Sequence, residues 1–515
     1  MNLDGEKGEK DFSGNNTYHP GLSDSDYDEG TGAVCPQHTT ERKLIARIDW
    51  HLMPFVIILY VLAFLDRVNI ANAKSFGLKT DLNLGGLEYN TALTIFFVPY
   101  VFFEVPSNIL LKKFSPRVWL PGCMVLAFGL VSIFQGLVQN YAGLLATRFF
   151  LGVFETGMFP GCFYLIGMWY KRSEAQKRYS LFFSSTSLAG AFGGLLASAI
   201  GKLDKVQGYS GWRWIFILEG TLTCVVAILF FFIFPSFPEG AKWLAEDEKA
   251  YVKARLQVEQ GNNGAERKIT PRDFFKTMKD HRVWLGGLMY FGLIVPAYSY
   301  AFFAPTIIST YKYNAIQTQL HSVPPWAASF VFSIIIASFS DYFRHRAAFA
   351  IAPLAITIAA FATLLTIHTN TMVEYAMLHL VTIGTYGVMP IVVCWFTLNL
   401  GGHHRRAIGT AWQIGFGNIG GIIATYIFPD SDAPQFRKGY GICLGFVVLS
   451  ALSSTCYLIS IHMENRRRAK TAHNTSLTDY EKTELGDLNP EYRYITFRTH
   501  EGKDVLVETA EWILF

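Results

Sequence analysis

The feature of this sequence that most constrains its fold is a series of long apolar runs separated by short polar segments. A helix needs about 20 apolar residues to cross a bilayer core about 30 Å thick. Twelve runs meet this requirement, at residues 51–70, 89–111, 118–138, 143–168, 180–201, 213–235, 283–305, 322–341, 347–367, 373–396, 408–428 and 440–462. We therefore predict an all-α membrane protein with twelve transmembrane helices, in contact with the lipid bilayer.

The composition favours this class and argues against others. Of 515 residues, 51% are hydrophobic and only 16% are charged, which is too apolar for a single soluble core. The basic residues behind the net charge of +4 lie beside apolar runs and not on one face, so we expect no nucleic-acid partner. The sequence has no CxxC, HxxxH or Ser/His/Asp grouping. We therefore expect no metal, no organic cofactor and no enzyme activity.

The longest internal polar segment divides the apolar runs six and six. We predict five parts, which are a disordered cytoplasmic tail at 1–45, a six-helix bundle at 46–235, a cytoplasmic loop at 236–282, a second six-helix bundle at 283–462 and a cytoplasmic tail at 463–515. The segment AFGGLLASAI at 191–200 resembles NIGGIIATYI at 418–427, and the same shift carries Arg178 onto Arg405. This repeat favours two parallel halves, although Gly-Gly pairs also recur in membrane helices simply because they permit close packing.

The distribution of Lys and Arg predicts the orientation. Basic residues concentrate in the loops after the second, fourth, eighth and tenth runs, and basic flanks occur at 42–43 and 466–468. The positive-inside rule then places both termini in the cytoplasm. The N-terminal segment also lacks the pattern of a cleavable signal peptide.

Charged residues inside the apolar runs are the candidates for chemistry. Asp66 and Arg67 lie in the first run, where each charge costs about 2.5–3.5 kcal/mol on insertion scales. The first run goes outward and the fourth inward, so Asp66 and Arg148 reach similar depth and are expected to pair. Glu155 follows Arg148 by two helical turns and is expected within reach of Arg67. Two acids and two bases would then line one polar pocket, unless the four only neutralise one another.

The chemistry of these groups suggests a coupling mechanism. A guanidinium holds a carboxylate through two parallel hydrogen bonds, so Arg67 and Arg148 are candidate anion receptors. An anion that takes over the arginine would release its acid partner to bind a proton. This exchange is a symport mechanism, with a proton as the coupling ion.

Weaker polar signals occur on other runs. Glu104 lies in the inner half of the second run, a turn after Tyr100, and either gates the pathway or pairs with Lys112 or Lys113. Neutral polar groups of the second half would contact either the substrate or another helix, namely Tyr298, Tyr300, Gln413 and Asn418.

Several longer motifs together resemble one family. They are RIDWHLMPF, LDRVNIANA, FFEVPSNILLKKFSPR, RFFLGVFETGMFPG, MWYKRSEAQKR, GWRWIFILEG, FAPTII, GTAWQIGFGNIGGIIATYIF and NPEYRY. In this order the sequence resembles the anion:cation symporter family of the major facilitator superfamily, and within it the fungal allantoate permease group, over roughly residues 41–497. The resemblance implies two six-helix bundles that import small organic anions with protons by alternating access.

The same resemblance implies roles for individual residues. Asp66 and Glu155 would take part in proton coupling, and Arg67 and Arg148 in substrate binding, joined less securely by Tyr100, Gln413 and Asn418. In the loop after the second run, Lys112 stands where the superfamily usually has an aspartate, whereas the loop after the eighth run keeps Asp341. Gating is therefore expected to involve Glu104, Lys112 and Asp341.

The leading hypothesis is a monomeric, proton-coupled importer of a small carboxylate, such as a vitamin, allantoate or an amino-acid derivative. Alternatives are a carrier of neutral or cationic solutes with the same fold, or a nutrient sensor that does not transport. A plasma-membrane location fits the family, and the tails contain no signal that selects against an internal membrane such as the endoplasmic reticulum.

Overall fold

The computed structural model describes residues 35–260, 270–343, 345–368, 370–401, 403–471 and 492–494, and the regular structure in these ranges is entirely helical. The long helices of the first half are α1 (Glu41–Ser75), α3 (Glu88–Lys113), α4 (Leu126–Gly136) preceded by the π-helical turns of η1 (Val118–Val125), α5 (Tyr141–Glu155), α6 (Met158–Gly167), α7 (Arg172–Ile200) and α8 (Gly211–Ile233). Those of the second half are α11 (His281–Ser309), α12 (Ala315–Phe343), α13 (Arg346–Thr366), α14 (Thr371–Leu398), α15 (His403–Ala424) and α16 (Arg437–Thr471).

Short helices lie in the connections. They are α2 (Leu78–Asp81), η2 (Gly201–Leu203), η3 (Val206–Gly208), η4 (Pro238–Gly240), α9 (Glu246–Gln260), α10 (Pro271–Met278) and η5 (Asp430–Asp432). Most of both predicted tails, at 1–34, 472–491 and 495–515, lies outside the described residues.

Every predicted apolar run lies mainly in helix, although 143–168 is interrupted at 156–157 and 408–428 continues past the end of its helix. The prediction of a twelve-helix membrane protein is confirmed. Ten helical stretches of the described chain are long and apolar enough to cross a bilayer. The other two runs correspond to α3, which carries Glu88 and Glu104, and α15, which begins with the sequence HHRR. Helices extend beyond the apolar runs because polar residues continue them, so α1 already begins at Glu41 and α16 ends at Thr471.

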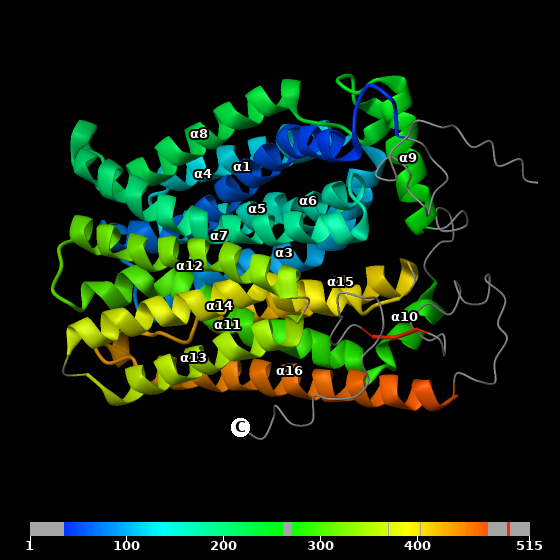
Figure 1. Ribbon diagram of the computed structural model, residues 1–515. Coiled ribbons are helices and arrows are strands. Elements are labelled where there is room, and N and C mark those ends of the chain that lie inside the picture. The colour runs from blue at the N-terminus through cyan, green and yellow to red at the C-terminus, as the bar shows by residue number, and fades with distance from the viewer. Residues whose placement is uncertain are drawn as a thin grey trace, which may run out of the picture.

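The helices form two bundles (Figure 1), in which α1 to α8 lie above α11 to α16. The bundles meet where α7 packs on α12, α1 on α11 and α3 on α15. The start of α1, the end of α16 and the connecting helices α9 and α10 all lie at one end of the molecule (Figure 1). This end carries the basic loops, and we call it the cytoplasmic end.

Matching ion pairs at the cytoplasmic end support the repeat between the halves. Arg178 binds Asp49 near the start of the first span, through Nε at 2.8 Å and Nη2 at 2.6 Å. Arg405 binds Asp280 immediately before the seventh span. The two arginines that align in the sequence therefore each bind an aspartate near the cytoplasmic start of their own bundle, although the two aspartates are not aligned by the same shift.

The outer surface of the bundles is apolar, as contact with lipid requires. On α8, Leu229, Phe232 and Ile233 are 57%, 69% and 59% exposed. Contiguous apolar surface of this kind is rare on soluble monomers and marks an interaction with a membrane or a partner. The polar groups described below lie instead on the buried faces of the helices.

Two glycines bring the second and fourth spans into close contact. A Cβ added to Gly152 would lie 2.2 Å from the carbonyl oxygen of Phe96, and one added to Gly157 would lie 1.9 Å from the Oγ of Ser107. Gly157 also lies in the break that separates α5 from α6. Because this break follows Glu155 directly, the glutamate stands at the end of α5 with α3 packed tightly beside it.

The described part of the NPEYRY motif packs against the cytoplasmic end of the second bundle. The backbone of Tyr494 exchanges two hydrogen bonds with the side chain of Asn465, each 2.8 Å long. Its ring lies 4.8 Å from the guanidinium carbon of Arg282 and 5.0 Å from that of Arg468. The motif thus joins the start of α11 to the end of α16.

Candidate functional site

The buried guanidinium of Arg67 links the two bundles. Its Nε donates to Oε1 of Glu155 at 2.8 Å, and its Nη2 binds the same oxygen. Its Nη1 donates to the hydroxyl of Tyr298 on α11, which belongs to the other bundle. The second oxygen of Glu155, Oε2, is buried without a hydrogen-bond partner in the described structure. The expected contact between Arg67 and Glu155 is therefore present, with Tyr298 as an additional ligand.

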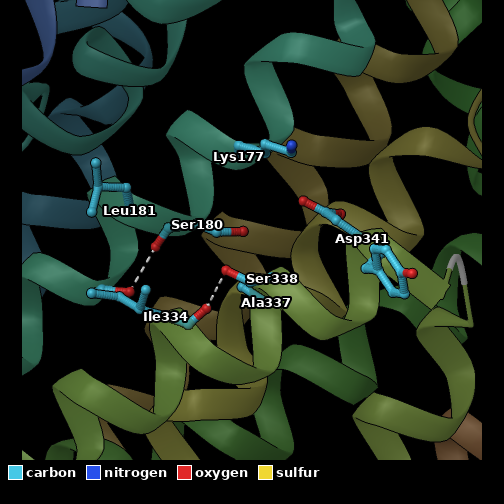
Figure 2. A pocket seen from close by; sticks show the side chains of 9 residues that line it. Lys177, Ser180, Leu181, Ile334, Ala337, Ser338 and Asp341 are labelled. Carbon is cyan, nitrogen blue, oxygen red and sulfur yellow. Dashed lines mark hydrogen bonds between the residues drawn. The ribbon is translucent and has the colours of Figure 1, made fainter.

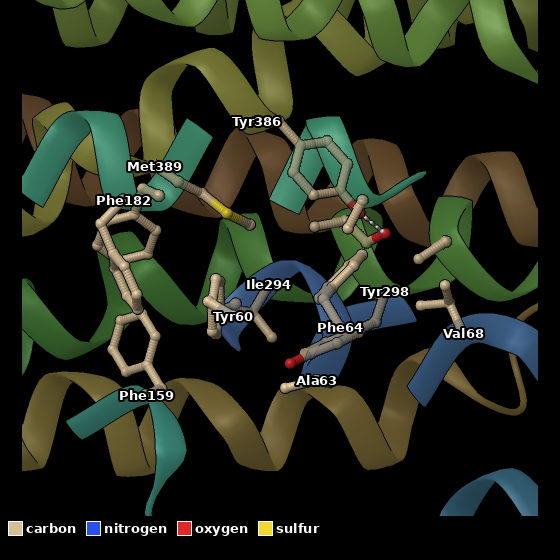
Figure 3. Close-up of a cluster of buried hydrophobic side chains, with 14 of the residues drawn as sticks. Tyr60, Ala63, Phe64, Val68, Phe159, Phe182, Ile294, Tyr298, Tyr386 and Met389 are labelled. Carbon is tan, nitrogen blue, oxygen red and sulfur yellow. Dashed lines mark hydrogen bonds between the residues drawn. The ribbon is translucent and has the colours of Figure 1, made fainter. Parts of the chain in front are cut away.

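Aromatic rings surround this guanidinium. Its carbon atom lies 5.0 Å from the ring centre of Phe96, 4.9 Å from that of Tyr100 and 5.8 Å from that of Tyr298. Such contacts with ring faces favour a cation. Figure 3 shows Tyr298 among buried side chains that include Tyr60 and Phe64. The polar contacts of Arg67 are thus set in a largely apolar environment, where electrostatic interactions are strong.

Arg148 lies beside this centre without joining the ion pair. Its Nη1 donates to the carbonyl oxygen of Arg67 at 3.2 Å and its Nε to that of Ala92 at 3.3 Å. Its Nη2 is buried without a partner among the described residues. Together Arg67, Arg148 and Glu155 carry a net formal charge of +1.

Asp66 does not occupy the expected common pocket. Its carboxylate accepts hydrogen bonds from Ser132 Oγ on α4 at 2.9 Å and from Thr223 Oγ1 on α8 at 3.1 Å. The expected pairing with Arg148 is wrong, because neighbouring residues on a helix point about 100° apart, so that Arg67 contacts Glu155 while Asp66 contacts α4 and α8. Asp66 therefore lies on a different side of α1 from the group formed by Arg67, Arg148 and Glu155.

The sequence interpretation missed Glu219 on α8. This carboxylate is 2% exposed and accepts a hydrogen bond from Asn69 Nδ2 at 2.6 Å. The available signal was a single acid in the apolar stretch WIFILEGTL, which carries the same cost as Asp66.

Of the remaining predicted substrate ligands, only Tyr100 contacts Arg67. Tyr100 lies at the Arg67 centre, as described above. Gln413 instead donates from Nε2 to the carbonyl oxygen of Gly286 at 3.1 Å, a contact between α15 and α11. Asn418 is buried on α15 and forms no hydrogen bond with the described residues. The structure therefore places Gln413 in a contact between helices and does not bring Asn418 to Arg67.

The predicted gating residues lie toward the cytoplasmic end. A cavity of about 330 Å³ separates α7 from α12 there, lined by Lys177 and Asp341 among others. Figure 2 shows these two side chains on opposite sides of the cavity. Asp341 accepts a hydrogen bond from Arg346 at 3.2 Å. Glu104 is partly buried and has no ion pair among the described side chains, which do not include that of Lys112.

Contacts between the bundles close the opposite, outer end. Lys74 and Lys79 each bind Asp430 at 2.7 Å, and Asn90 donates to the carbonyl oxygen of Thr425 at 2.6 Å. Burial alone would raise the pKa of Asp430, but the hydrogen bonds and charges of both lysines lower it below its ordinary value of 3.8.

The described chain contains no group of three or more His, Cys, Asp or Glu side chains that could hold a metal ion.

Comparison with known proteins places this geometry in context. The sequence matches the Major Facilitator Superfamily over residues 56–425. It is 33% identical to the MFS transporter prlL of Fungal sp. (strain NRRL 50135), over 84% of this chain and 88% of that protein. It is 29% identical to the major facilitator-type transporter hxnP of Emericella nidulans, over 88% of this chain and 93% of that protein.

Solved structures share the fold at low sequence identity. A bacterial homologue of the human lysosomal transporter Spinster superposes with a TM-score of 0.60 at 13% identity, over 79% of this chain and 95% of that one. The xylose transporter XylE of E. coli superposes with a TM-score of 0.59 at 15% identity, over 78% of this chain and 96% of that one.

Proposed function

We propose that this chain imports a small organic anion together with protons. It belongs to the Major Facilitator Superfamily and is a multi-pass membrane transporter, not an enzyme. The proposal includes membership of the anion:cation symporter family and its allantoate permease group, a monomeric state and a plasma-membrane location. A small carboxylate is the favoured substrate class.

The observation that carries the proposal is the position of Arg67. Its guanidinium is buried where the bundles meet, and it binds a carboxylate from one bundle and a hydroxyl from the other. A guanidinium remains charged in any environment and matches the planar geometry of a carboxylate. A neutral solute would gain little from this charge, so the site favours an anion over a sugar or a cation.

Exchange of partners on Arg67 would couple the two substrates. An incoming carboxylate competes with Glu155 for the Nε and Nη2 of Arg67, and Tyr298 offers a further hydrogen bond. Glu155, once separated from its cation in a buried position, then binds a proton because an unpaired charge there is costly. The net charge of the centre stays constant while one anion and one proton enter.

The contacts between the bundles support alternating access. The outer end is closed by the lysines on Asp430, whereas a cavity separates α7 from α12 at the cytoplasmic end. Opening the outer end requires loss of the Asp430 contacts and approach of α7 to α12. Lys177 and Asp341, which are on opposite sides of the cavity, would attract one another during this approach.

The test is uptake by the full-length protein in proteoliposomes. A panel of labelled carboxylates is offered with and without an inward proton gradient, each beside its uncharged amide. We expect uptake of a carboxylate, stimulation by the gradient and no uptake of its amide. Equal uptake of the amide, or uptake unaffected by Arg67→Ala, would refute the anion receptor. Binding without uptake would favour the sensor hypothesis.

A further inference from the structure

A second polar cluster lies inside the first bundle, on a different side of α1 from the Arg67–Glu155 pair. Two hydrogen-bonded layers are present where α1, α4 and α8 meet. In one, Ser132 and Thr223 donate to Asp66, and in the other Asn69 donates to Glu219. Glu219 precedes Thr223 by four residues and Asn69 follows Asp66 by three, so the second layer lies one helical turn beyond the first.

Buried atoms without partners lie in the second layer. Gln135 follows Ser132 by three residues on α4, which places it on the same helix face and at the level of Glu219. It is fully buried, and both its amide nitrogen and its amide oxygen lack a partner in the described structure. Oε1 of Glu219 also lacks one. Buried polar groups without partners are rare, and they suggest a ligand that the protein chain does not supply.

The cluster contains two acids and no base. Neither Asp66 nor Glu219 forms an ion pair with any described residue, and the side chains that donate hydrogen bonds to them are neutral. Burial of an unpaired ion costs several kcal/mol. Two carboxylates one helical turn apart would also repel each other, so the cluster needs at least one positive charge.

Other neighbouring helices do not provide that charge. Residues 180–200 of α7 and residues 118–136 of η1 and α4 contain no charged side chain. The thiol of Cys224 on α8 contacts the carbonyl oxygen of Leu126. From α5, Arg148 bonds to the backbone of Arg67 and not to Asp66.

We propose that Asp66 and Glu219 form a second proton-binding site, separate from the Arg67–Glu155 pair, in which the two carboxyl groups keep at least one proton between them. A protonated carboxyl group gains a donor, and the amide oxygen of Gln135 is the unfilled acceptor at its level. The Asn69 side chain continues the polar row outward, because Asn72 donates to it at 3.3 Å. Proton exchange follows this row along α1, and use of the site in transport rests on the proposed function.

The proton can be detected without a transported anion. Infrared difference spectra of the purified full-length protein in lipid nanodiscs, recorded between acidic and alkaline pH, report the C=O band of each protonated carboxyl group. We expect Glu219→Gln and Asp66→Asn each to remove or shift the same band. Glu155→Gln, a matched change on the other side of α1, should leave that band in place.

Three results would overturn the proposal. The first is that neither Glu219→Gln nor Asp66→Asn alters any carboxyl band, and the second is that only Glu155→Gln does. The third is a band change on exchanging potassium for sodium, which would identify a metal cation as the ligand. If Glu219→Gln does not fold, Asn69→Ala replaces it, and the loss of its hydrogen bond must shift the Glu219 band. None of these results affects anion binding at Arg67, which the uptake assay tests separately.

Discussion

The two bundles are alike at their cytoplasmic ends and different at their centres. Asp49–Arg178 in the first bundle and Asp280–Arg405 in the second are equivalent ion pairs. Deep in the spans, however, the first bundle contains the charged residues Asp66, Arg67, Arg148, Glu155 and Glu219, whereas the second contributes neutral groups such as Tyr298.

This difference separates the mechanical from the chemical parts of the molecule. Paired contacts at the ends suit two bundles that rock against each other, which requires similar parts on both sides. Charge recognition requires only one set of ionisable groups, provided that the other bundle completes it. Tyr298 does so, because its hydroxyl binds Arg67 across the interface. The following changes test how sharply the two bundles are divided.

Removing Arg67 should have the largest effect. We expect Arg67→Ala to abolish uptake and to reduce stability by about 3–5 kcal/mol, because the buried Glu155 loses its cation. Thermal unfolding and uptake of the purified protein measure both effects. Adding Glu155→Gln should restore much of the stability but none of the uptake. A double variant no more stable than Arg67→Ala would contradict the origin assigned to the loss.

Neutralising Glu155 should remove coupling while leaving binding intact. Glu155→Gln cannot exchange a proton, so we expect anion exchange to continue and an imposed pH gradient to lose its effect on uptake. Counterflow and gradient-driven uptake in the same proteoliposomes separate these functions. Accumulation driven by the gradient at the normal level would show that Glu155 is not the coupling group.

Removing one hydroxyl from the second bundle should have a moderate effect. A hydrogen bond to a charged group contributes about 1.5–3 kcal/mol, so we expect Tyr298→Phe to raise KM about tenfold or more. Tyr300→Phe is the matched control, because its hydroxyl is also buried on α11 but does not bind Arg67. Equal effects of the two changes would remove the distinction between Tyr298 and the other neutral groups of its bundle.

The equivalent ion pairs should differ modestly in strength. The Asp280 and Arg405 side chains are 8% and 10% exposed, against 34% and 14% for Asp49 and Arg178. We therefore expect Asp280→Asn to lower the melting temperature more than Asp49→Asn, whose pair contributes at most about 1 kcal/mol. Burial alone would raise the pKa of Asp280, but Arg282 and Arg405 lower it below 3.8.

The pH dependence of this difference provides a check. A carboxyl group whose pKa is lower in the folded protein stabilises it above the unfolded pKa, and the effect is lost as the pH falls through the folded value. The destabilisation by Asp280→Asn should therefore be full at neutral pH and decline below about pH 3.8. A destabilisation independent of pH would point to packing in place of charge.

The smallest effect is expected at the outer end, where the second bundle supplies the acid. Asp430 is 45% exposed, so its pairs with Lys74 and Lys79 are partly screened by water. We expect Asp430→Asn to increase labelling of an Asn90→Cys variant by an impermeant thiol reagent, because the outer contact loosens. Lys205→Gln, in the outer loop between α7 and α8, should not change the labelling.

The lengths of the apolar runs predicted the fold well, because the thickness of the bilayer sets the length of a spanning helix. Each run of sufficient length became mainly helix, and the split into six and six followed from one polar segment. Helix ends were less predictable, since α16 continues through charged residues to Thr471. A polar stretch can extend a helix outside the membrane without leaving a signal in hydropathy.

The site was predictable only in part, because the depth of a residue in the membrane does not determine which way its side chain points. Heights along the spans brought Arg67 to Glu155 correctly, but they also suggested a contact between Asp66 and Arg148 that does not form. Which side of α1 each residue faces depends on the packing of α4 and α8, which one sequence does not reveal. Glu219 had the same signal as Asp66, a charge in an apolar run, and was recognised only as part of a motif.

The contacts of Arg67 also limit how tightly an anion can bind to this protein. Glu155 and Tyr298 already occupy the guanidinium, so the molecule contains its own competitor for the site. An anion gains only the difference between its own bonds and those it displaces, and the returning carboxylate helps to expel it afterwards. Weak net binding and rapid release then arise from one arrangement, and selectivity depends on how well a substrate replaces two groups that never leave the protein.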